Sequence, residues 1–329
     1  MAGLQFLGRT RAMNNSHAGR AHATPGIARK VRWYFSARNR RLGKRLLVGL
    51  IGANIQGSLS PALQEDACAA AGIAGHYHLM DLDQLPGRRL DDLLTAARMA
   101  GFAGLNVTYP CKEDVIGLLD DITPEARQIG AVNTVTFDRD GRATGHNTDR
   151  TGFRNSFEET LGRAAIAGKT ALLVGAGGAG RALAFALLDL GAECLLVHDL
   201  DGARAADLVA NVTAALKRPC ARVAEDPRAA LAQAAGVVNA TPVGMLGIPG
   251  NPVPMEAVAA RHWVVDVIYT PLETELIAGA RAKGSAVLNG AGMCIHQAVE
   301  AFRLWTGLEA DLERMRHTFM AAATVRDRV

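Results

Sequence analysis

The sequence predicts a two-domain α/β protein, and three observations support this fold class. The chain has 329 residues, which is enough for two domains that each bury a core of their own. Beyond residue 45, short apolar runs alternate with segments of helical character, the pattern of parallel strands joined by crossover helices. At Thr170 the pattern changes, because a short apolar strand is followed directly by a glycine-rich turn and another helix. We therefore expect two α/β units in series.

The elements of the first half are predicted from apolar runs and from residues that favour helix ends. Strands are predicted over residues 45–51, 77–82, 104–107 and 132–137. A helix is predicted to begin at Ser60-Pro61, with the serine as N-cap and the proline as the first helical residue, and to end near Gly72. A second helix is predicted over residues 90–100, ending at Gly101.

The second half is predicted to contain further strands, which cover residues 170–174, 194–198, 236–240 and 263–268. A helical run over 181–190 follows the first of them. After Gly290 another helix is predicted, with Val299, Phe302 and Trp305 on one face. The Pro- and Gly-rich segment 244–254 is expected to be a surface loop.

The glycine-rich turn has the G-x-G-x-x-G spacing of a Rossmann-type dinucleotide site. It lies between a strand and a helix, as that motif requires, and consists of Gly175, Ala176, Gly177, Gly178, Ala179 and Gly180. Glycines let a pyrophosphate approach the backbone, and the first turn of the following helix offers unpaired N–H groups. The alternative is a tight turn with a purely structural role. The strand before the turn and an acid at the expected distance after it favour a cofactor site.

That acid is Asp199, at the end of the second strand of this unit. A carboxylate here can accept the ribose hydroxyls of NAD and would repel the 2′-phosphate of NADP. The first basic residue after it is Arg204, so no phosphate clamp stands directly beside it. We therefore expect NAD in preference to NADP. The alternative, compatible role for Asp199 is the N-cap of the next helix.

Two polar segments in the first half predict the chemical site. Residues 106–112 follow a predicted strand, and Asn147-Thr148-Asp149 precede a helical run. Oxidation of an alcohol requires a base for the hydroxyl proton, and a lysine fixed by a carboxylate can provide it. We select Lys112 and Asp149 as this pair. Taken singly, the lysine could be an ordinary surface residue and the aspartate a helix N-cap.

A substrate carboxylate would need an anchor, and no arginine clamp is evident in the sequence. Ser58 and Ser60 could donate two hydroxyl hydrogen bonds to such a group. Ser60 is also the predicted N-cap of its helix, but a cap uses the oxygen as acceptor and leaves the hydroxyl hydrogen free.

The formal net charge of +4 comes from the N-terminal segment. Eleven of the 36 Lys and Arg residues lie at or before Arg45, whereas the first acidic residue is Glu65. The remaining 25 face 32 Asp and Glu, a net of −7, so the body of the protein gives no argument for nucleic-acid binding. Residues 1–45 are predicted to be a disordered basic tail. A transit peptide, a wrongly assigned start codon and, third, nucleic-acid contact remain open for it.

Cysteine usage and hydropathy indicate the compartment. The five cysteines are scattered without C-x-x-C spacing, so neither a metal site nor a disulfide framework is expected. No run of 18 apolar residues predicts a membrane helix. We expect a cytoplasmic protein, with organelle targeting by the tail left open, that is a monomer or a homodimer.

Taken in order, these segments resemble the shikimate/quinate dehydrogenase family, in particular its NAD-using branch. The resemblance runs from about Leu46 to the C-terminus. It is carried by the following motifs: Ser58-Leu-Ser60-Pro61, Asn106-Val-Thr108-Tyr-Pro-Cys-Lys112, Gly130-Ala-Val-Asn133-Thr134, Gly145-His-Asn147-Thr148-Asp149, Gly175-Ala-Gly-Gly-Ala179, Asn239-Ala-Thr241-Pro-Val-Gly244-Met245, Tyr269-Thr-Pro271-Leu-Glu-Thr274 and Gly290-Ala-Gly-Met293-Cys-Ile-His-Gln297.

The resemblance implies a substrate-binding domain over 46–149, an NAD-binding domain over 150–290, and C-terminal helices over 291–329 that fold back onto the first domain. It implies Lys112 as acid/base and Asp149 as its partner. The residues implied in binding the ring acid, shikimate or quinate, are Ser58, Ser60, Asn106, Thr108, Asn133, Tyr269 and Gln297. The residues implied in lining the cofactor are Gly175 to Ala179, Asp199, Arg204, Thr241, Val267 and Gly290.

The sequence departs from the family pattern at three places. NADP-using members carry Asn-Arg-Thr where this chain has Asp199-Leu200-Asp201, which favours NAD. Members that favour quinate often carry Thr at the position of Ser60, so shikimate is the leading substrate and quinate the second. The long N-terminal tail has no counterpart in the family.

Three other functions are considered. A quinate- or amino-shikimate-preferring paralogue would share the whole motif set. A non-catalytic ligand sensor on this scaffold would have lost Lys112 and Asp149, both of which are present. A folate or glutamyl-tRNA oxidoreductase would share only the nucleotide half and leave the serine pair unexplained.

Overall fold

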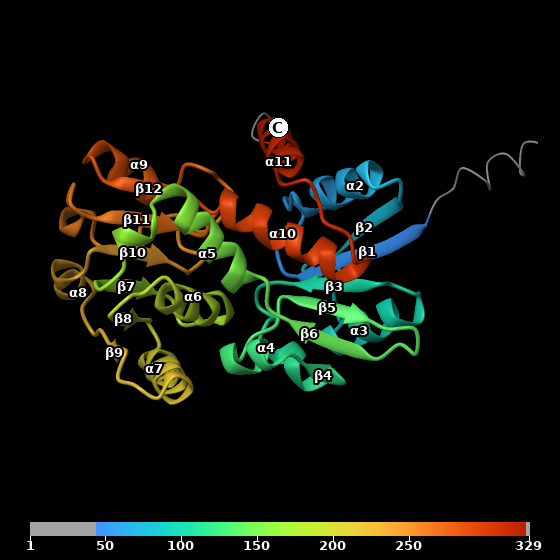
Figure 1. Ribbon diagram of the computed structural model, residues 1–329, viewed down its shortest axis with the longest axis horizontal. Coiled ribbons are helices and arrows are strands. Elements are labelled where there is room, and N and C mark those ends of the chain that lie inside the picture. Colours follow the sequence, from blue (N-terminus) through green and yellow to red (C-terminus); the bar gives the residue numbers. More distant parts are fainter. Residues whose placement is uncertain (1–43, 327–329) are drawn as a thin grey trace, which may run out of the picture. The chain divides into compact units, whose positions relative to one another are not determined.

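Two six-stranded β-sheets, each flanked by helices, make up residues 44–326, the part of the chain that the computed structural model describes (Figure 1). The first sheet has the strand order β2-β1-β3-β5-β6-β4, and the second has the order β12-β11-β10-β7-β8-β9. The tail predicted over residues 1–45 lies, up to position 43, outside the described residues.

The first sheet is built from residues 45–146. Its strands are β1 (Arg45–Gly52), β2 (Ala74–Asp81), β3 (Gly104–Val107), β4 (Asp121–Ile122), β5 (Thr134–Phe137) and β6 (Ala143–His146). The connecting helices are α2 (Ser60–Ala70), α3 (Leu90–Met99), the 3₁₀ helix η1 (Asp114–Leu118) and α4 (Pro124–Ile129). Its apolar core lies mainly between β1, β3, β5 and helix α3.

The expectation of parallel strands is wrong for part of this sheet. Strand β5 pairs antiparallel with β3 and with β6, and β6 was not predicted at all. The five residues between β5 and β6 are too few for a crossover helix, so the chain must form a hairpin. Asp138 Oδ1 accepts hydrogen bonds from the N–H groups of Asp140 and Arg142, and Gly141 takes a left-handed φ of 78°.

The start of α2 also differs from the prediction. Leu59 occupies the N-cap position, and Ser60 is the first helical residue. Ser60 N donates to Ser58 Oγ at 3.3 Å, so it is Ser58 whose oxygen accepts at this helix end. The prediction failed because Leu59 already has helical dihedrals (φ −89°, ψ −5°), which shifts the helix start by one residue. Ser60 is buried, and its hydroxyl is not used as a cap.

The second sheet is entirely parallel, as the alternation of strands and helices predicted. Its strands are β7 (Thr170–Val174), β8 (Cys194–His198), β9 (Ala221–Val223), β10 (Gly236–Asn239), β11 (Trp263–Asp266) and β12 (Ala286–Leu288). Its helices are α6 (Gly178–Asp189), α7 (Gly202–Leu216), α8 (Pro227–Gln233) and α9 (Glu275–Ala282), with 3₁₀ helices η2 (Arg163–Ala165) and η3 (Met255–Ala257). Helix α6 is buried along most of its length between the sheet and α5 (Asp149–Thr160).

Helices α5 and α10 (Ala291–Thr306) connect the two sheets, and the last helix, α11 (Leu312–Arg326), follows α10 (Figure 1). Helix α10 packs along α5, where a Cβ added to Gly152 would lie 2.9 Å from the carbonyl oxygen of Met293. At its far end, Trp305 Nε1 donates to the carbonyl oxygen of Val135 in β5 at 3.0 Å. Phe302 of α10 and Phe319 of α11 share an apolar cluster with α2. The last two helices therefore pack against the elements of the first sheet.

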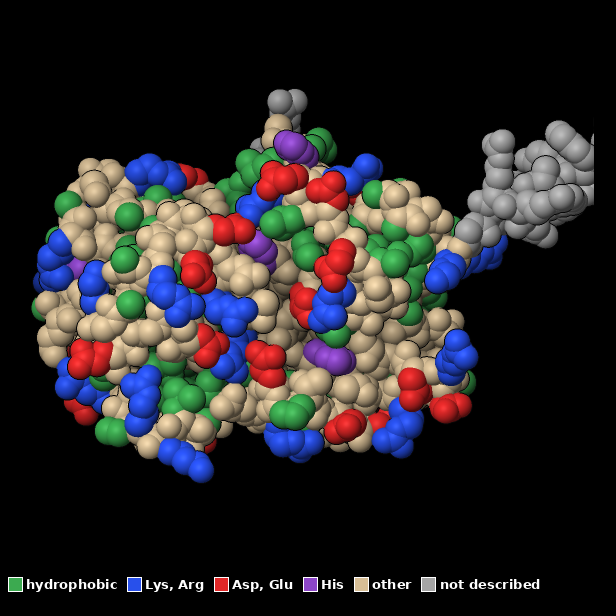
Figure 2. All heavy atoms as spheres, viewed as in Figure 1, with side chains coloured by type: hydrophobic (Ala, Val, Ile, Leu, Met, Phe, Trp, Pro, Cys, Tyr) green, Lys and Arg blue, Asp and Glu red, His purple; other side chains and the backbone are tan. Residues whose placement is uncertain are grey.

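The surface of the described part carries both signs of charge. On the face shown in Figure 2, basic and acidic side chains are interspersed over both sheets. Among the helices of residues 44–326, none combines the length and the apolar character needed to cross a membrane.

Candidate active site

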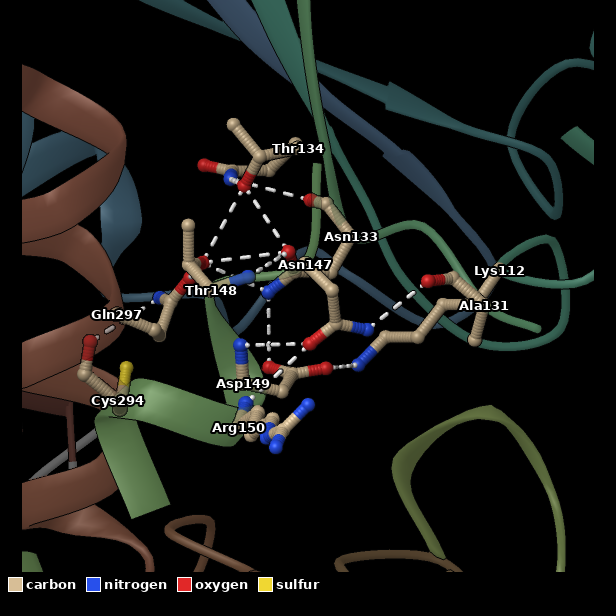
Figure 3. A network of polar contacts seen from close by, with 11 residues as sticks. Lys112, Ala131, Asn133, Thr134, Asn147, Thr148, Asp149, Arg150, Cys294 and Gln297 are labelled. Atoms are coloured by element: carbon tan, nitrogen blue, oxygen red, sulfur yellow. Dashed lines mark hydrogen bonds and ion pairs between the residues drawn. The ribbon is translucent and has the colours of Figure 1, made fainter. Parts of the chain in front are cut away.

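The ends of strands and helices of the first sheet bring Lys112 and Asp149 together (Figure 3). Lys112 follows β3, and Asp149 is the first residue of α5, directly after β6. Lys112 Nζ lies 2.5 Å from Asp149 Oδ2, and only 15% and 6% of the two side chains are exposed. Both side chains are thus withdrawn from water while they face one another, which makes the lysine more than an ordinary surface residue.

Neighbouring amides fix the second oxygen of the Asp149 carboxylate. Asn133 Nδ2 donates to Asp149 Oδ1 at 2.8 Å and to Thr148 Oγ1 at 2.9 Å. Asn133 Oδ1 in turn accepts from the N–H of Thr148 at 2.7 Å. Because both carboxylate oxygens are held, the orientation of Asp149 towards Lys112 is set before any substrate binds.

The alternative role of Asp149 as a helix N-cap is wrong. Asp149 lies inside α5, and Thr148 occupies the N-cap position. Asn147 Oδ1 accepts from the N–H groups of Asp149 at 3.1 Å and of Arg150 at 3.2 Å. Asn147 thereby serves the first N–H groups of the helix, which leaves the carboxylate of Asp149 free for Lys112.

The polar network continues from Asn133 to the two serines. Asn106 Nδ2 donates to the Asn133 carbonyl oxygen at 3.2 Å, and Asn106 Oδ1 accepts from the Tyr77 hydroxyl at 2.8 Å. Ser60 lies beside Tyr77, close enough to influence the pKa of its hydroxyl. Burial raises the pKa of the Tyr77 hydroxyl well above its ordinary value, so this phenol stays protonated.

A second branch reaches the other serine. Ser58 lies beside Tyr269, and burial raises the pKa of this phenol as well. Gln297 of α10 donates to the Cys294 carbonyl oxygen at 3.0 Å, and its Oε1 lies 3.4 Å from Thr148 Oγ1. The C-terminal helix α10 therefore brings Gln297 beside the residues that hold Asp149.

Thr108 lies at the end of β3, between Asn106 and Lys112 in sequence, but outside this network. Its hydroxyl makes no hydrogen bond to any described residue. Its methyl group packs against Gly52, where an added Cβ would lie 2.3 Å from it. The side-chain oxygen is thus available to a ligand.

Sequence reasoning assigned no individual role to four residues of this network, although it included Asn147 and Thr148 in a segment predicted to form the chemical site. Tyr77, Thr134, Asn147 and Thr148 all contact its members directly. The Asn-Thr pairs at 133–134 and 147–148 were a usable signal, because each flanks a strand end. Tyr77 gave none, since its sequence context is that of any core aromatic residue.

The glycine-rich turn lies directly against Lys112. Gly175 has a left-handed φ of 102°, and a Cβ there would lie 2.9 Å from the Thr241 methyl group. A Cβ on Gly180 would lie 1.9 Å from the Gly175 carbonyl oxygen. A Cβ on Gly178 would lie 2.8 Å from Lys112 Cβ. The turn therefore admits only glycine at these positions, and it places the N-terminus of α6 next to the candidate base.

Asp199 contacts the same turn. Asp199 Oδ2 accepts from the N–H of Ala176 at 2.7 Å, and Oδ1 accepts from the N–H of Asp201 at 2.9 Å. The alternative role of Asp199 as the N-cap of α7 is wrong, since Asp201 is the N-cap and accepts from the Ala203 N–H. Leu200, where a phosphate-binding arginine would stand, is 97% exposed.

The residues fit a bound dinucleotide. A glycine-rich turn, the N–H groups of a helix start and a carboxylate at the next strand end all converge at one edge of the second sheet. Val267 and Gly290 contact one another at this edge, where a Cβ on Gly290 would lie 2.0 Å from the Val267 carbonyl oxygen.

Comparison with known proteins identifies the family. Residues 50–135 match the model of the shikimate dehydrogenase substrate binding domain, and residues 290–318 match that of the shikimate 5′-dehydrogenase C-terminal domain. The chain is 48% identical over 283 residues to the quinate/shikimate dehydrogenase (NAD(+)) of Corynebacterium efficiens, an alignment that covers 84% of this chain and 98% of the relative. The chain belongs to the shikimate dehydrogenase family.

Shikimate dehydrogenases of both cofactor types are among the relatives. The shikimate dehydrogenase (NADP(+)) of Streptomyces avermitilis is also 48% identical, over 273 residues that cover 82% of this chain and 93% of the relative. Overall identity therefore does not distinguish the two cofactors, and the residues around Asp199 must be considered directly.

Solved structures of the family share the fold. The quinate dehydrogenase from Corynebacterium glutamicum in complex with NAD has a TM-score of 0.78 and 44% identity, and the match covers 85% of this chain and all of that one. The shikimate 5-dehydrogenase from Thermus thermophilus in complex with NADP(H) and shikimate has a TM-score of 0.72 and 36% identity, over 84% of this chain and 99% of that one.

A buried acid beside the dinucleotide edge predicts a pH-dependent stability in this family member. Asp266 ends β11 and accepts hydrogen bonds from Asn239, Ile268 and Thr274. Burial raises the pKa of Asp266 from its ordinary value to about 6. A pKa that is higher in the folded than in the unfolded chain stabilises the fold at low pH, and this contribution is lost as the pH rises through about 6.

Asp266→Asn should therefore flatten the pH dependence. Between pH 5 and 7.5, the free energy of unfolding of the variant should rise relative to that of the parent by roughly 1–2 kcal/mol. Urea unfolding at both pH values measures this difference, with Asp121→Asn on the exposed edge of the first sheet as control. Parallel pH profiles for Asp266→Asn and the parent would show that Asp266 takes up no proton on folding.

Proposed function

We propose that this chain is a quinate/shikimate dehydrogenase that uses NAD, with shikimate as the leading substrate and quinate as the second. The observation that carries the proposal is the Lys112–Asp149 pair, held by Asn133 and lying directly against the glycine-rich turn. A base and a dinucleotide site so close together suit oxidation of a secondary hydroxyl by hydride transfer. NAD, when bound, supplies the hydride acceptor.

The chain's own residues would act on the proton and on the orientation of the ring. Lys112 Nζ would accept the proton of the reacting hydroxyl as its carbon becomes a carbonyl carbon, giving 3-dehydroshikimate from shikimate or 3-dehydroquinate from quinate. Asp149 would hold Lys112 and accept a hydrogen bond from a neighbouring hydroxyl. Asn106, Thr108, Asn133 and Gln297 offer further donors and acceptors for a polyhydroxylated ring.

The substrate carboxylate would be bound at the start of α2. Ser58 lies beside the half-buried Tyr269 and Ser60 beside the buried Tyr77, and both phenols stay protonated. These hydroxyls form an uncharged cluster of donors that can rotate towards a carboxylate. Such a cluster supports the proposal that hydroxyl groups take the place of an arginine clamp.

Removing these hydroxyls should weaken substrate binding and leave the chemical step largely intact. A hydrogen bond to a charged group contributes roughly 1.5–3 kcal/mol, so Ser58→Ala and Ser60→Ala should each raise KM for shikimate roughly tenfold to a hundredfold. The value of kcat should change much less, because the carboxylate is bound equally in ground and transition states. Steady-state kinetics measures both constants.

The buried Ser285, which lies far from this site and donates to the Ala259 carbonyl oxygen, provides the control Ser285→Ala. That variant should keep the parent's KM. If the double variant of Ser58 and Ser60 binds shikimate as tightly as the parent, the serines serve only to shape the start of α2.

A crossed assay tests the function as a whole. The full chain is incubated with shikimate or quinate, each with NAD and with NADP, and reduced cofactor is followed by its absorbance. We expect turnover of shikimate with NAD to be the most efficient of the four combinations, with quinate and NAD second. No turnover in any combination would overturn the dehydrogenase assignment and favour the ligand-sensor alternative.

A further inference from the structure

Glu113, the residue after the candidate base, links the first sheet to two helices of the second. Its Oε1 accepts from Arg204 Nη2 at 2.7 Å, and its Oε2 lies 3.5 Å from Arg181 Nε. Arg181 belongs to the first turn of α6 and Arg204 to the first turn of α7. The contact with Arg181 is an ion pair without hydrogen-bond geometry, since Arg181 Nε is buried and has no hydrogen-bond partner.

Both arginines lie beside the glycine-rich turn. A Cβ on Gly177 would be 3.4 Å from Arg204 Nη2, so this guanidinium rests against the turn itself. Arg181 follows the last glycine of the turn, Gly180, directly in sequence, and its guanidinium reaches the end of α4, where a Cβ on Gly130 would be 3.3 Å from Arg181 Nη1. A guanidinium in this position would attract any additional phosphate of a dinucleotide, because it can pair with two phosphate oxygens at once.

We propose that Glu113 is a cofactor-specificity residue, which disfavours NADP by occupying the guanidinium group of Arg204. The inference rests on the proposed function, because it concerns the cofactor of that reaction. It adds a determinant outside the Asp199-Leu200-Asp201 segment.

The local charge balance supports this role. Arg181 is paired with Asp207 as well as with Glu113, whereas the Arg204 side chain contacts only Glu113 among the described acids. Glu113 and Asp207 therefore neutralise the two arginines. The carboxylate of Asp199 then remains as a negative charge at the turn with no basic side chain of the described residues paired to it. If Glu113 were neutral, Arg204 would lose its partner and could turn to a phosphate near Asp199.

The solvent exposure of the Glu113–Arg204 pair sets the size of the expected change in NADPH affinity. The side chains of Glu113 and Arg204 are 34% and 48% exposed, so solvent screens their attraction. Exposed ion pairs are weak, and we therefore expect a change of roughly three- to tenfold and not a reversal of cofactor preference.

The experiment measures cofactor binding without substrate. NADPH and NADH are titrated separately into the full chain and into Glu113→Gln, at low ionic strength, by calorimetry. We expect Glu113→Gln to bind NADPH roughly three- to tenfold more tightly than the parent does, with a much smaller change for NADH. The adjacent exposed Asp114, which contacts neither arginine, gives the matched control Asp114→Asn, in which both affinities should stay as in the parent.

Variants of Arg204 provide the second test. In the Glu113→Gln background, Arg204→Gln should abolish the gain in NADPH affinity. In the parent background, where Glu113 already pairs with Arg204, Arg204→Gln should change NADPH affinity little. This test does not need the Glu113→Gln variant, so it remains valid even if that variant fails to fold. Equal changes for NADH and NADPH in Glu113→Gln, or a large loss of NADPH affinity in Arg204→Gln alone, would overturn the inference.

The two proposals fail in different ways. A parent chain that binds NADH but oxidises neither shikimate nor quinate would overturn the proposed function and leave the binding comparison valid. A parent that binds neither cofactor would overturn both.

Discussion

Replacing Lys112 by alanine is expected to lower the turnover of shikimate by roughly 10²- to 10⁴-fold, the usual contribution of a positioned acid/base group. The reason is geometric. Lys112 Nζ is the only amino group that the described residues place within 2.5 Å of Asp149 Oδ2, and it lies beside the glycine-rich turn. Steady-state kinetics with NAD and shikimate measures the loss, and titration with NADH shows whether cofactor binding persists.

The control for this variant is a lysine outside the site. Lys169 donates only to backbone carbonyl groups near the start of β7, so Lys169→Ala should keep the parent's kcat. Near-normal turnover in Lys112→Ala would remove Lys112 from the mechanism. A loss of NADH binding together with turnover would instead point to a structural role at the glycine-rich turn, because Gly178 packs against the Lys112 side chain.

The preference for NAD over NADP should be roughly a hundredfold or more in kcat/KM. Asp199 Oδ2 already accepts from Ala176 of the glycine-rich turn, which places a carboxylate where the adenosine ribose is expected. Facing NADP, this carboxylate would meet a phosphate with up to two negative charges, and poorly screened like-charge contacts cost several kcal/mol. At about 1.4 kcal/mol per factor of ten, this cost corresponds to the expected ratio.

Two variants test whether NADP is disfavoured by repulsion from Asp199 or by the lack of an arginine at position 200. Asp199→Asn removes the repulsion without adding a group that binds the phosphate. It should therefore reduce the preference for NAD over NADP and not reverse it. Adding Leu200→Arg supplies a guanidinium at a site that is 97% exposed and free to accept it, and this should shift the preference towards NADP. Steady-state kinetics at saturating shikimate compares the cofactors. Equal efficiency of the parent with NAD and NADP would show that Asp199 does not face the ribose.

The second sheet and its turn were predictable because their signals are local. Strands β7 and β8 begin and end as predicted, since short apolar runs bounded by glycine or charged residues have few alternatives. The spacing of Gly175, Gly178 and Gly180 is likewise a local requirement, because a side chain at any of them would collide with the backbone or with a neighbour. At these positions the requirement for glycine can be read directly from the sequence.

The first sheet was harder because its pairing depends on distant residues. Strand β6 is short and half polar, and only its pairing with β5 on one side and β4 on the other makes it a strand. The start of α2 was misplaced by one residue because the dihedrals of Leu59 are not determined by the local sequence alone. Hairpin pairing and helix starts of this kind depend on tertiary packing.

The sequence by itself determined the α/β class, the glycine-rich turn, and the identities of Lys112 and Asp149 as a candidate pair. The tertiary structure alone decided that Asn147 and not Asp149 serves the N–H groups of α5, which frees the carboxylate for the lysine. It alone joined Glu113 to Arg204, residues 91 positions apart. The physical reason is the sequence distance over which each interaction acts. Backbone conformation near a glycine is determined by adjacent atoms. Hydrogen bonds and ion pairs between distant side chains form only where the fold brings their segments within about 3 Å.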